Sequence, residues 1–195
     1  MRCAPNSTAR RAINPASSQA ISSSVFRGSS DGYGMVDRQL NNSLLFSDEN
    51  ETRAFGARLI AACQGGGVIT ISGDLGTGKT TLVRGALQAM GVSSGVRSPT
   101  YTLIEYYPFE SIAVAHFDLY RLGDPEELEY LGYRDYLNQQ TLCFIEWPER
   151  AGGYLNAVDL EIQLEYDVDG RRLRLLAHSE WGRQVESRLG RADRH

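Results

Sequence analysis

The chain has 195 residues, a formal net charge of −4 at pH 7 and 23% charged residues. This length suits one domain with a sizeable core, and the small negative charge indicates no surface field strong enough to bind nucleic acid. No apolar run approaches membrane-spanning length, and the three widely spaced cysteines make neither a disulfide framework nor a zinc site.

Residues 1–43 differ in composition from the rest of the chain. They are rich in Ser, Ala and Arg, and they lack the apolar surface that a packed core needs, so we expect a disordered extension. A transit peptide has a similar composition, but an extension without function, with Met35 as the true start, is the simpler interpretation. We expect the folded domain to cover residues 44–177 and a polar tail without strong pattern to cover 178–195.

The stretch SDENETRAFGARLIAAC, residues 47–63, predicts the first helix. Asp48 followed by Glu51 three residues later is a capping-box pattern, which satisfies the free N–H groups at a helix start. The apolar residues at helical spacing would form the buried stripe: Phe55, Leu59, Ala62 and Cys63.

The stretch SGDLGTGKTT, residues 72–81, has the spacing of a P-loop, with Gly73, four residues, then Gly78, Lys79 and Thr80. Glycines let the backbone turn its N–H groups toward an anion, the lysine brings a charge to the outer phosphates, and the hydroxyl ligates Mg²⁺. A β-branched strand pattern precedes the loop, and an amphipathic helix pattern over 81–91 follows it. This context predicts a nucleoside triphosphate as the ligand.

Two later apolar strands each end in a carboxylate. Asp118 closes IAVAHFDLY, and Glu146 closes the apolar run of TLCFIEWPE. A P-loop needs a carboxylate at a strand end to hold or orient Mg²⁺ and water. Each residue taken alone could be a helix cap or a surface acid, but the two together favour a catalytic role.

The last part of the domain predicts a β-hairpin. Apolar and polar residues alternate over 159–166, Asp169-Gly170 is a turn signal, and the alternation resumes over 172–175. We expect this hairpin at the edge of the sheet. The predicted fold class is α/β, a three-layer P-loop NTPase-like fold with a mixed sheet and a C-terminal antiparallel hairpin.

Two further features, the SPT motif and Trp147, have more than one interpretation. SPT at 98–100 lies where nucleotide switches sense the γ-phosphate, so Thr100 or Thr102 could offer a hydroxyl, but an ordinary turn is an equal alternative. Trp147 could line a pocket, meet a partner or fill the core. We interpret His116, which alternates into a buried strand, as structural.

Four motifs in this order, GDLGTGKTT, SPTYTL, HFDLYRL with DPEELE, and FIEWPE, resemble the TsaE (YjeE) family. Those proteins are small bacterial P-loop ATPases needed to make threonylcarbamoyladenosine in tRNA. The resemblance runs from about Leu44 to Leu176. Thr77 stands where the family usually has alanine.

The resemblance implies a role for particular residues. The residues that would bind the phosphates of ATP or ADP are Gly76, Thr77, Gly78, Lys79, Thr80 and Thr81. Thr80 and Glu146 would ligate Mg²⁺, and Lys79, Asp118 and Glu146 would be catalytic. Glu49, at the start of the first helix, and Arg171, in the hairpin, would flank the nucleotide.

The resemblance also implies partners. TsaE proteins act in the cytoplasm with TsaD and TsaB to modify the adenosine next to the anticodon, and their ATP hydrolysis is thought to reset that complex. We therefore expect an ATPase that is slow alone and stimulated by its partners, with no tRNA-binding motif of its own and no membrane segment. A small-molecule kinase, or a nucleotide-responsive binding module without useful turnover, are the alternatives.

Overall fold

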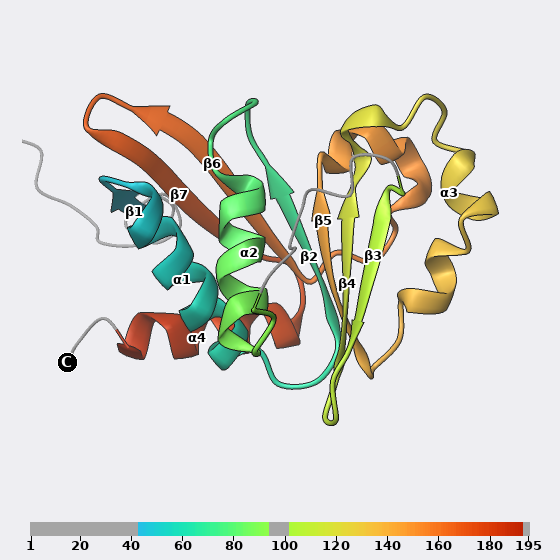
Figure 1. The fold of residues 1–195 in the computed structure, drawn as a ribbon, viewed down its shortest axis with the longest axis horizontal. Coiled ribbons are helices and arrows are strands. Elements are labelled where there is room, and N and C mark those ends of the chain that lie inside the picture. The colour runs from blue at the N-terminus through green and yellow to red at the C-terminus, as the bar shows by residue number, and fades with distance from the viewer. Residues whose placement is uncertain (1–42, 94–101, 193–195) are drawn as a thin grey trace, which may run out of the picture. The chain divides into compact units, whose positions relative to one another are not determined.

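A seven-stranded mixed β-sheet organises the described part of the chain (Figure 1). The structure is a computed structural model and describes residues 43–93 and 102–192. The predicted disordered extension, except for Ser43, and the SPT motif at 98–100 lie outside these residues. The strands are β1 (Ser43–Phe46), β2 (Gly67–Ser72), β3 (Ile104–Pro108), β4 (Ala113–Asp118), β5 (Thr141–Glu146), β6 (Leu160–Asp167) and β7 (Gly170–Ala177). Their order across the sheet is β1-β7-β6-β2-β5-β4-β3.

Helices cover both faces of this sheet. The α-helices and 3₁₀ turns are α1 (Glu49–Ala62), α2 (Lys79–Ala89), η1 (Leu119–Arg121), α3 (Glu127–Tyr130), η2 (Tyr133–Tyr136), η3 (Pro148–Tyr154) and α4 (Glu180–Ala192). α1, α2 and α4 pack on one face in a core that includes Ile71 and Phe144. α3 and the 3₁₀ turns pack on the other face, over Cys143 and Ile145. The predicted three-layer α/β fold with a mixed sheet is confirmed. None of the described helices is long and apolar enough to cross a membrane.

α1 begins as its capping pattern predicts. The Asp48 carboxylate accepts a hydrogen bond from the Glu51 N–H at 2.9 Å, and the Glu51 carboxylate accepts one from the Ser47 N–H at 2.6 Å. The first bond satisfies an N–H group that the helix itself leaves without an acceptor, and the second holds the residue that precedes the N-cap. Phe55 and Leu59 lie in the core, as their spacing predicts.

Two glycines bring α1 and α2 into close contact. A Cβ atom at Gly56 would overlap the Leu82 carbonyl oxygen, and one at Gly85 would overlap the Arg53 carbonyl oxygen. The helices can approach this closely only because neither position carries a side chain. As a result, the first turn of α1 lies beside the start of α2, where Thr52 Cγ2 is 3.5 Å from the position of a Cβ at Gly78.

The C-terminal hairpin forms as predicted, but it does not lie at the edge of the sheet. β6 and β7 pair antiparallel from Leu160 opposite Ala177 to Asp167 opposite Gly170. β1 then pairs antiparallel with the outer side of β7, with Phe46 opposite Arg171. The edge prediction is wrong because β1 has only four residues, which is too few to show a strand period.

The prediction of a polar tail from residue 178 is also wrong, because α4 covers Glu180–Ala192. Trp181, Val185 and Leu189 follow at four-residue spacing and pack into the core of the α1–α2 face. α4 also closes the end of α1, since Trp181 Nε1 donates to the Gln64 carbonyl and Arg188 Nη1 donates to the Ala62 carbonyl, each at 2.8 Å. The last turn of α1 has no basic residue of its own to meet these carbonyls.

Candidate functional site

The P-loop between β2 and α2 uses its glycines to turn the backbone. Gly73, Gly76 and Gly78 have φ values of 141°, 83° and 103°, in the region that favours glycine. A Cβ at Gly73 would overlap the Leu164 carbonyl oxygen, and one at Gly76 would lie 2.6 Å from the Tyr166 hydroxyl. The loop therefore lies directly against β6, and this close approach adds a second reason for glycine at both positions.

Side chains hold the loop from two sides. The Thr77 hydroxyl donates to the Asp74 carbonyl at 2.9 Å, and Thr77 is fully buried. On the outside, the Tyr166 hydroxyl donates to the Leu75 carbonyl at 3.0 Å. The side chain of Thr77, one of the predicted phosphate-binding residues, thus faces into the protein, and an alanine there would lack its hydrogen bond.

Lys79 is the first residue of α2 and is buried, with 4% of its surface exposed. Its ammonium donates to the carbonyls of Gly73 at 2.6 Å and Asp74 at 2.8 Å, and it lies 3.8 Å from the centre of the Trp147 ring. Burial lowers the pKa of Lys79, and the nearby carboxylates, Glu146 first, oppose that shift. The ammonium is held where a phosphate would replace the two carbonyls as its partner.

The end of β5 is joined to the P-loop through Glu146. Its Oε2 accepts a hydrogen bond from the Thr80 hydroxyl at 2.9 Å, and its Oε1 lies 2.8 Å from His116 Nε2. Glu146 is 1% exposed and His116 is fully buried. Two residues separated by 66 positions, Thr80 and Glu146, are therefore in direct contact, as the predicted Mg²⁺ site requires.

Asp118 lies beside Glu146 because β4 and β5 are parallel and in register at their last residues. Its Oδ1 accepts a hydrogen bond from the Tyr120 N–H at 3.2 Å, so Asp118 caps the turn η1. It also faces the cavity at the end of the sheet. The helix-cap interpretation of Asp118 is confirmed, and its role as a site carboxylate stays a prediction that its position at the cavity allows.

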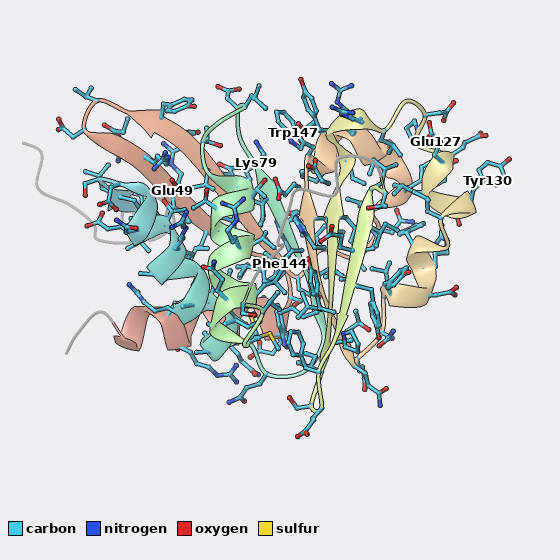
Figure 2. All side chains as sticks on the ribbon, in the orientation of Figure 1. Glu49, Lys79, Glu127, Tyr130, Phe144 and Trp147 are labelled. Atoms are coloured by element: carbon cyan, nitrogen blue, oxygen red, sulfur yellow. The ribbon has the colours of Figure 1, made fainter. Side chains whose placement is uncertain are left out.

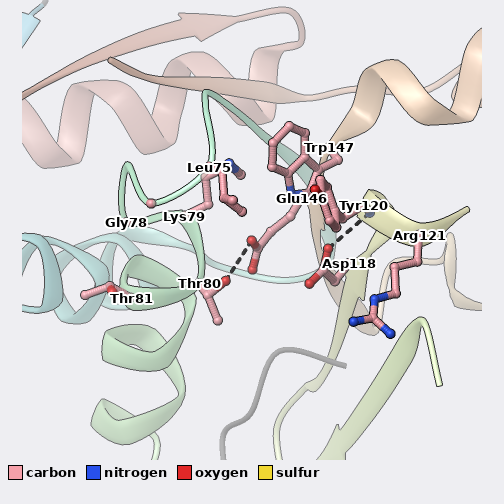
Figure 3. A pocket seen from close by; sticks show the side chains of 11 residues that line it. Leu75, Gly78, Lys79, Thr80, Thr81, Asp118, Tyr120, Arg121, Glu146 and Trp147 are labelled. Atoms are coloured by element: carbon pink, nitrogen blue, oxygen red, sulfur yellow. Dashed lines mark hydrogen bonds between the residues drawn. The ribbon is translucent and has the colours of Figure 1, made fainter. Parts of the chain in front are cut away.

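A cavity of about 370 Å³ opens over the P-loop (Figure 3). The residues that line it are Leu75, Gly76, Gly78, Lys79, Thr80, Thr81, Asp118, Tyr120, Arg121, Glu146 and Trp147. Figure 3 shows Thr80, Asp118 and Glu146 directed at one space. Trp147 has a left-handed φ of 58°, and its ring lies 4.9 Å from that of Tyr120. Trp147 lines the pocket, at the same end of the sheet as Lys79 (Figure 2), and it also packs against the core on the α3 face.

The two residues predicted to flank the nucleotide lie outside this lining. Glu49 forms an ion pair with Arg53 at 2.5 Å, and Arg84 Nη1 is 3.9 Å from the same carboxylate. Arg171 lies closer to the P-loop, since its Nε is 3.5 Å from the position of a Cβ at Gly78. That Nε is buried and has no hydrogen-bond partner within residues 43–93 and 102–192. The geometry brings Arg171, but not Glu49, to the edge of the loop.

The oxygen atoms at this site are the kind that Mg²⁺ binds. Thr80 offers a hydroxyl and Glu146 a carboxylate, and Mg²⁺ is usually held by one or two such protein oxygens together with phosphate oxygens and water. The described residues contain no cluster of three or more His, Cys, Asp or Glu side chains that could hold a metal ion by themselves. The residues present fit a Mg²⁺ ion that is bound together with a nucleotide.

His116 is fully buried, as its alternation along the strand predicts, and it also contacts Glu146, which the sequence pattern alone did not indicate. The signal for this contact is the two-residue spacing between His116 and Asp118, which puts both side chains on the same face of β4. Thr102, proposed as a hydroxyl near the phosphates, is exposed and is not among the lining residues.

Comparison with known proteins gives one consistent result. The model of the family described as "Threonylcarbamoyl adenosine biosynthesis protein TsaE" matches residues 46–173. A relative from Haemophilus influenzae, named tRNA threonylcarbamoyladenosine biosynthesis protein TsaE, is 47% identical over 120 residues, which are 62% of this chain and 76% of that protein. A relative of the same name from Bacillus subtilis is 35% identical over 63% of this chain and 76% of its own length. The crystal structure of YdiB from Bacillus subtilis superimposes with a TM-score of 0.65 and 26% identity, over 77% of this chain and 95% of that one.

Proposed function

Because the chain belongs to the TsaE family, we propose that it binds ATP with Mg²⁺ at the P-loop and hydrolyses it in support of threonylcarbamoyladenosine formation on tRNA. The observation that carries this proposal is the hydrogen bond between Thr80 and Glu146, beside the buried ammonium of Lys79. A hydroxyl and a carboxylate that meet next to a phosphate-binding lysine are the protein's share of a P-loop Mg²⁺ site.

The proposed role of each site residue in binding or hydrolysing ATP follows from its position. The Lys79 ammonium leaves the Gly73 and Asp74 carbonyls and binds the outer phosphates, and the Trp147 ring keeps water from its other side. Thr80 and Glu146 would hold Mg²⁺, which neutralises charge on the phosphates. Asp118, fixed by its bond to the Tyr120 N–H, would orient a water molecule at the site.

We expect slow hydrolysis by the isolated chain. P-loop hydrolysis often depends on an added arginine, which contributes roughly 10³–10⁵ in rate and is frequently supplied by a partner. Arg121 lines the cavity and is the cis candidate, whereas Arg84 is not among the lining residues and its Nη1 lies 3.9 Å from the Glu49 carboxylate. The proposed partner is a TsaD–TsaB pair, whose docking would complete the site or reposition Arg121.

ATP turnover measured under three conditions tests this function: the chain alone, with candidate small-molecule acceptors, and with TsaD–TsaB. We expect turnover near background alone and a clear rise with the protein pair, and the rise should vanish in Lys79→Ala. Phosphate transfer to an acceptor would instead support a kinase. Nucleotide binding without turnover under any condition would support a binding module.

A further inference from the structure

We infer that His116 is a positioning residue that fixes the Glu146 carboxylate for the cation, an inference that rests on the proposed function. His116 is fully buried and does not line the cavity, so it does not touch the nucleotide. Among the described residues, its connection to the site is through Glu146, whose Oε1 lies 2.8 Å from His116 Nε2.

The two strands give this contact a fixed geometry. Asp118 and Glu146 are opposite each other at the ends of β4 and β5, and His116 is opposite Phe144, one side-chain pair earlier. Because alternate residues of a strand share a face, His116, Asp118 and Glu146 all project toward α2. His116 therefore sits beneath the two carboxylates and reaches the nearer oxygen of Glu146 from inside the protein.

Hydrogen bonding selects one tautomer of the imidazole ring. Nδ1 is buried and has no hydrogen-bond partner in the described structure, so a hydrogen on Nδ1 would have no acceptor. The tautomer that fits carries its hydrogen on Nε2 and donates it to Glu146 Oε1. Thr80 donates to Oε2 of the same group, so each oxygen of the Glu146 carboxylate has one donor.

A purely structural histidine would not account for this arrangement. An aliphatic side chain would fill the position without burying a polar ring, and burial of Nδ1 without a partner carries a cost. Without the His116 hydrogen bond, Oε1 would lose its donor and the carboxylate would lose its fixed orientation. Groups that orient a metal ligand typically change metal affinity by about 10- to 100-fold when they are removed.

The test compares His116→Leu with His116→Gln, whose amide can place an N–H near the position of Nε2. Calorimetry measures ATP affinity with EDTA and with Mg²⁺, and the ratio of the two is the Mg²⁺ enhancement. We expect His116→Leu to keep EDTA affinity within about twofold of wild type and to lose about tenfold of the Mg²⁺ enhancement, and His116→Gln to restore most of it. Full enhancement in folded His116→Leu, or no restoration by Gln, would overturn the inference.

Phe144→Leu is the matched control, because it removes core volume beside His116 and leaves the His116–Glu146 bond in place. It should lower the melting temperature without changing the Mg²⁺ enhancement, and a loss equal to that of His116→Leu would mean that packing alone is responsible. If His116→Leu does not fold, His116→Asn replaces it, because the shorter asparagine amide should not reach Glu146. A Mg²⁺ enhancement in His116→Asn equal to that in His116→Gln would then refute the inference. If Mg²⁺ does not strengthen ATP binding by the wild-type chain, the proposed function itself fails.

Discussion

The P-loop has β4 and β5, with their terminal carboxylates, on one side and the β6–β7 hairpin on the other, and these two sides differ in how their polar side chains are held. On the carboxylate side, Lys79, His116 and Glu146 are each at most 4% exposed, and hydrogen bonds link Glu146 to the loop and to the histidine. On the hairpin side, Tyr166 is 59% exposed, and Glu49 belongs to a surface ion pair. Charges interact more strongly where water is excluded. We therefore expect ATP turnover to depend on the residues of the carboxylate side and to tolerate substitutions on the hairpin side.

The largest effect should come from Lys79→Ala. Truncation of one partner of a buried charge–phosphate pair costs a few kcal/mol, which is about 100-fold or more in ATP affinity. Calorimetry measures this loss. Arg183→Ala, which removes an exposed cation from an ion pair on α4, is the control and should bind ATP as wild type does. Equal affinities in Lys79→Ala and wild type would contradict the P-loop assignment.

The second effect should separate binding from turnover. Glu146→Gln keeps the shape of the side chain but weakens a Mg²⁺ ligand, so we expect roughly a thirtyfold drop in ATP turnover, or about 2 kcal/mol, with ATP still bound. Asp118→Asn should lower turnover less. Steady-state assays with TsaD–TsaB at saturating ATP provide the measurement, and normal rates in both variants would locate the metal site elsewhere.

On the hairpin side, Arg171 and Glu49 should differ from each other. Arg171→Ala should weaken ATP binding about fivefold, since its buried Nε lies next to the loop and has no partner in the described residues. Glu49→Ala removes a solvent-exposed ion pair and should change affinity by no more than about twofold. A larger loss in Glu49→Ala than in Arg171→Ala, measured by calorimetry, would reverse this ranking.

The smallest effect concerns pH and the ligand-free chain. Because burial lowers the pKa of Lys79 below its unfolded value of 10.5, the folded state binds its proton less readily than the unfolded state. The charged ammonium therefore lowers the free energy of unfolding at pH values below its lowered pKa. This destabilisation decreases as the pH rises toward 10.5. We expect the unfolding free energy of wild type, relative to Lys79→Met, to increase over this window in denaturant titrations. A flat difference would mean that the hydrogen bonds of the ammonium fully offset its burial.

Much of the architecture was predictable because its signals are local. The glycines, lysine and threonine of the P-loop predict a loop between a strand and a helix, and Asp118 and Glu146 end short, β-branched or aromatic apolar runs that are typical of buried strands. The capping pair of Asp48 and Glu51 likewise forms within a single turn of chain.

The other features of the fold and the site depend on contacts between residues that are far apart in the sequence, and a local sequence pattern does not show such contacts. α4 was not predicted because its apolar residues Trp181, Val185 and Leu189 stand among charged residues. They form a buried stripe only when the helix packs on the core of the α1–α2 face. The bond between His116 and Glu146 depends on the register of two strands. Similarly, the left-handed backbone of Trp147 could not be expected from a non-glycine residue.

Lys79 is the only lysine in the chain, and its ammonium lies against the face of the Trp147 indole. A sample in which lysine is isotope-labelled only at Nζ therefore gives a single lysine resonance in a magnetic resonance spectrum. The ring current of the indole should displace that resonance from its position in free lysine. When a phosphate draws the ammonium away from the ring, the displacement should disappear, so one peak reports on the occupancy of the whole site.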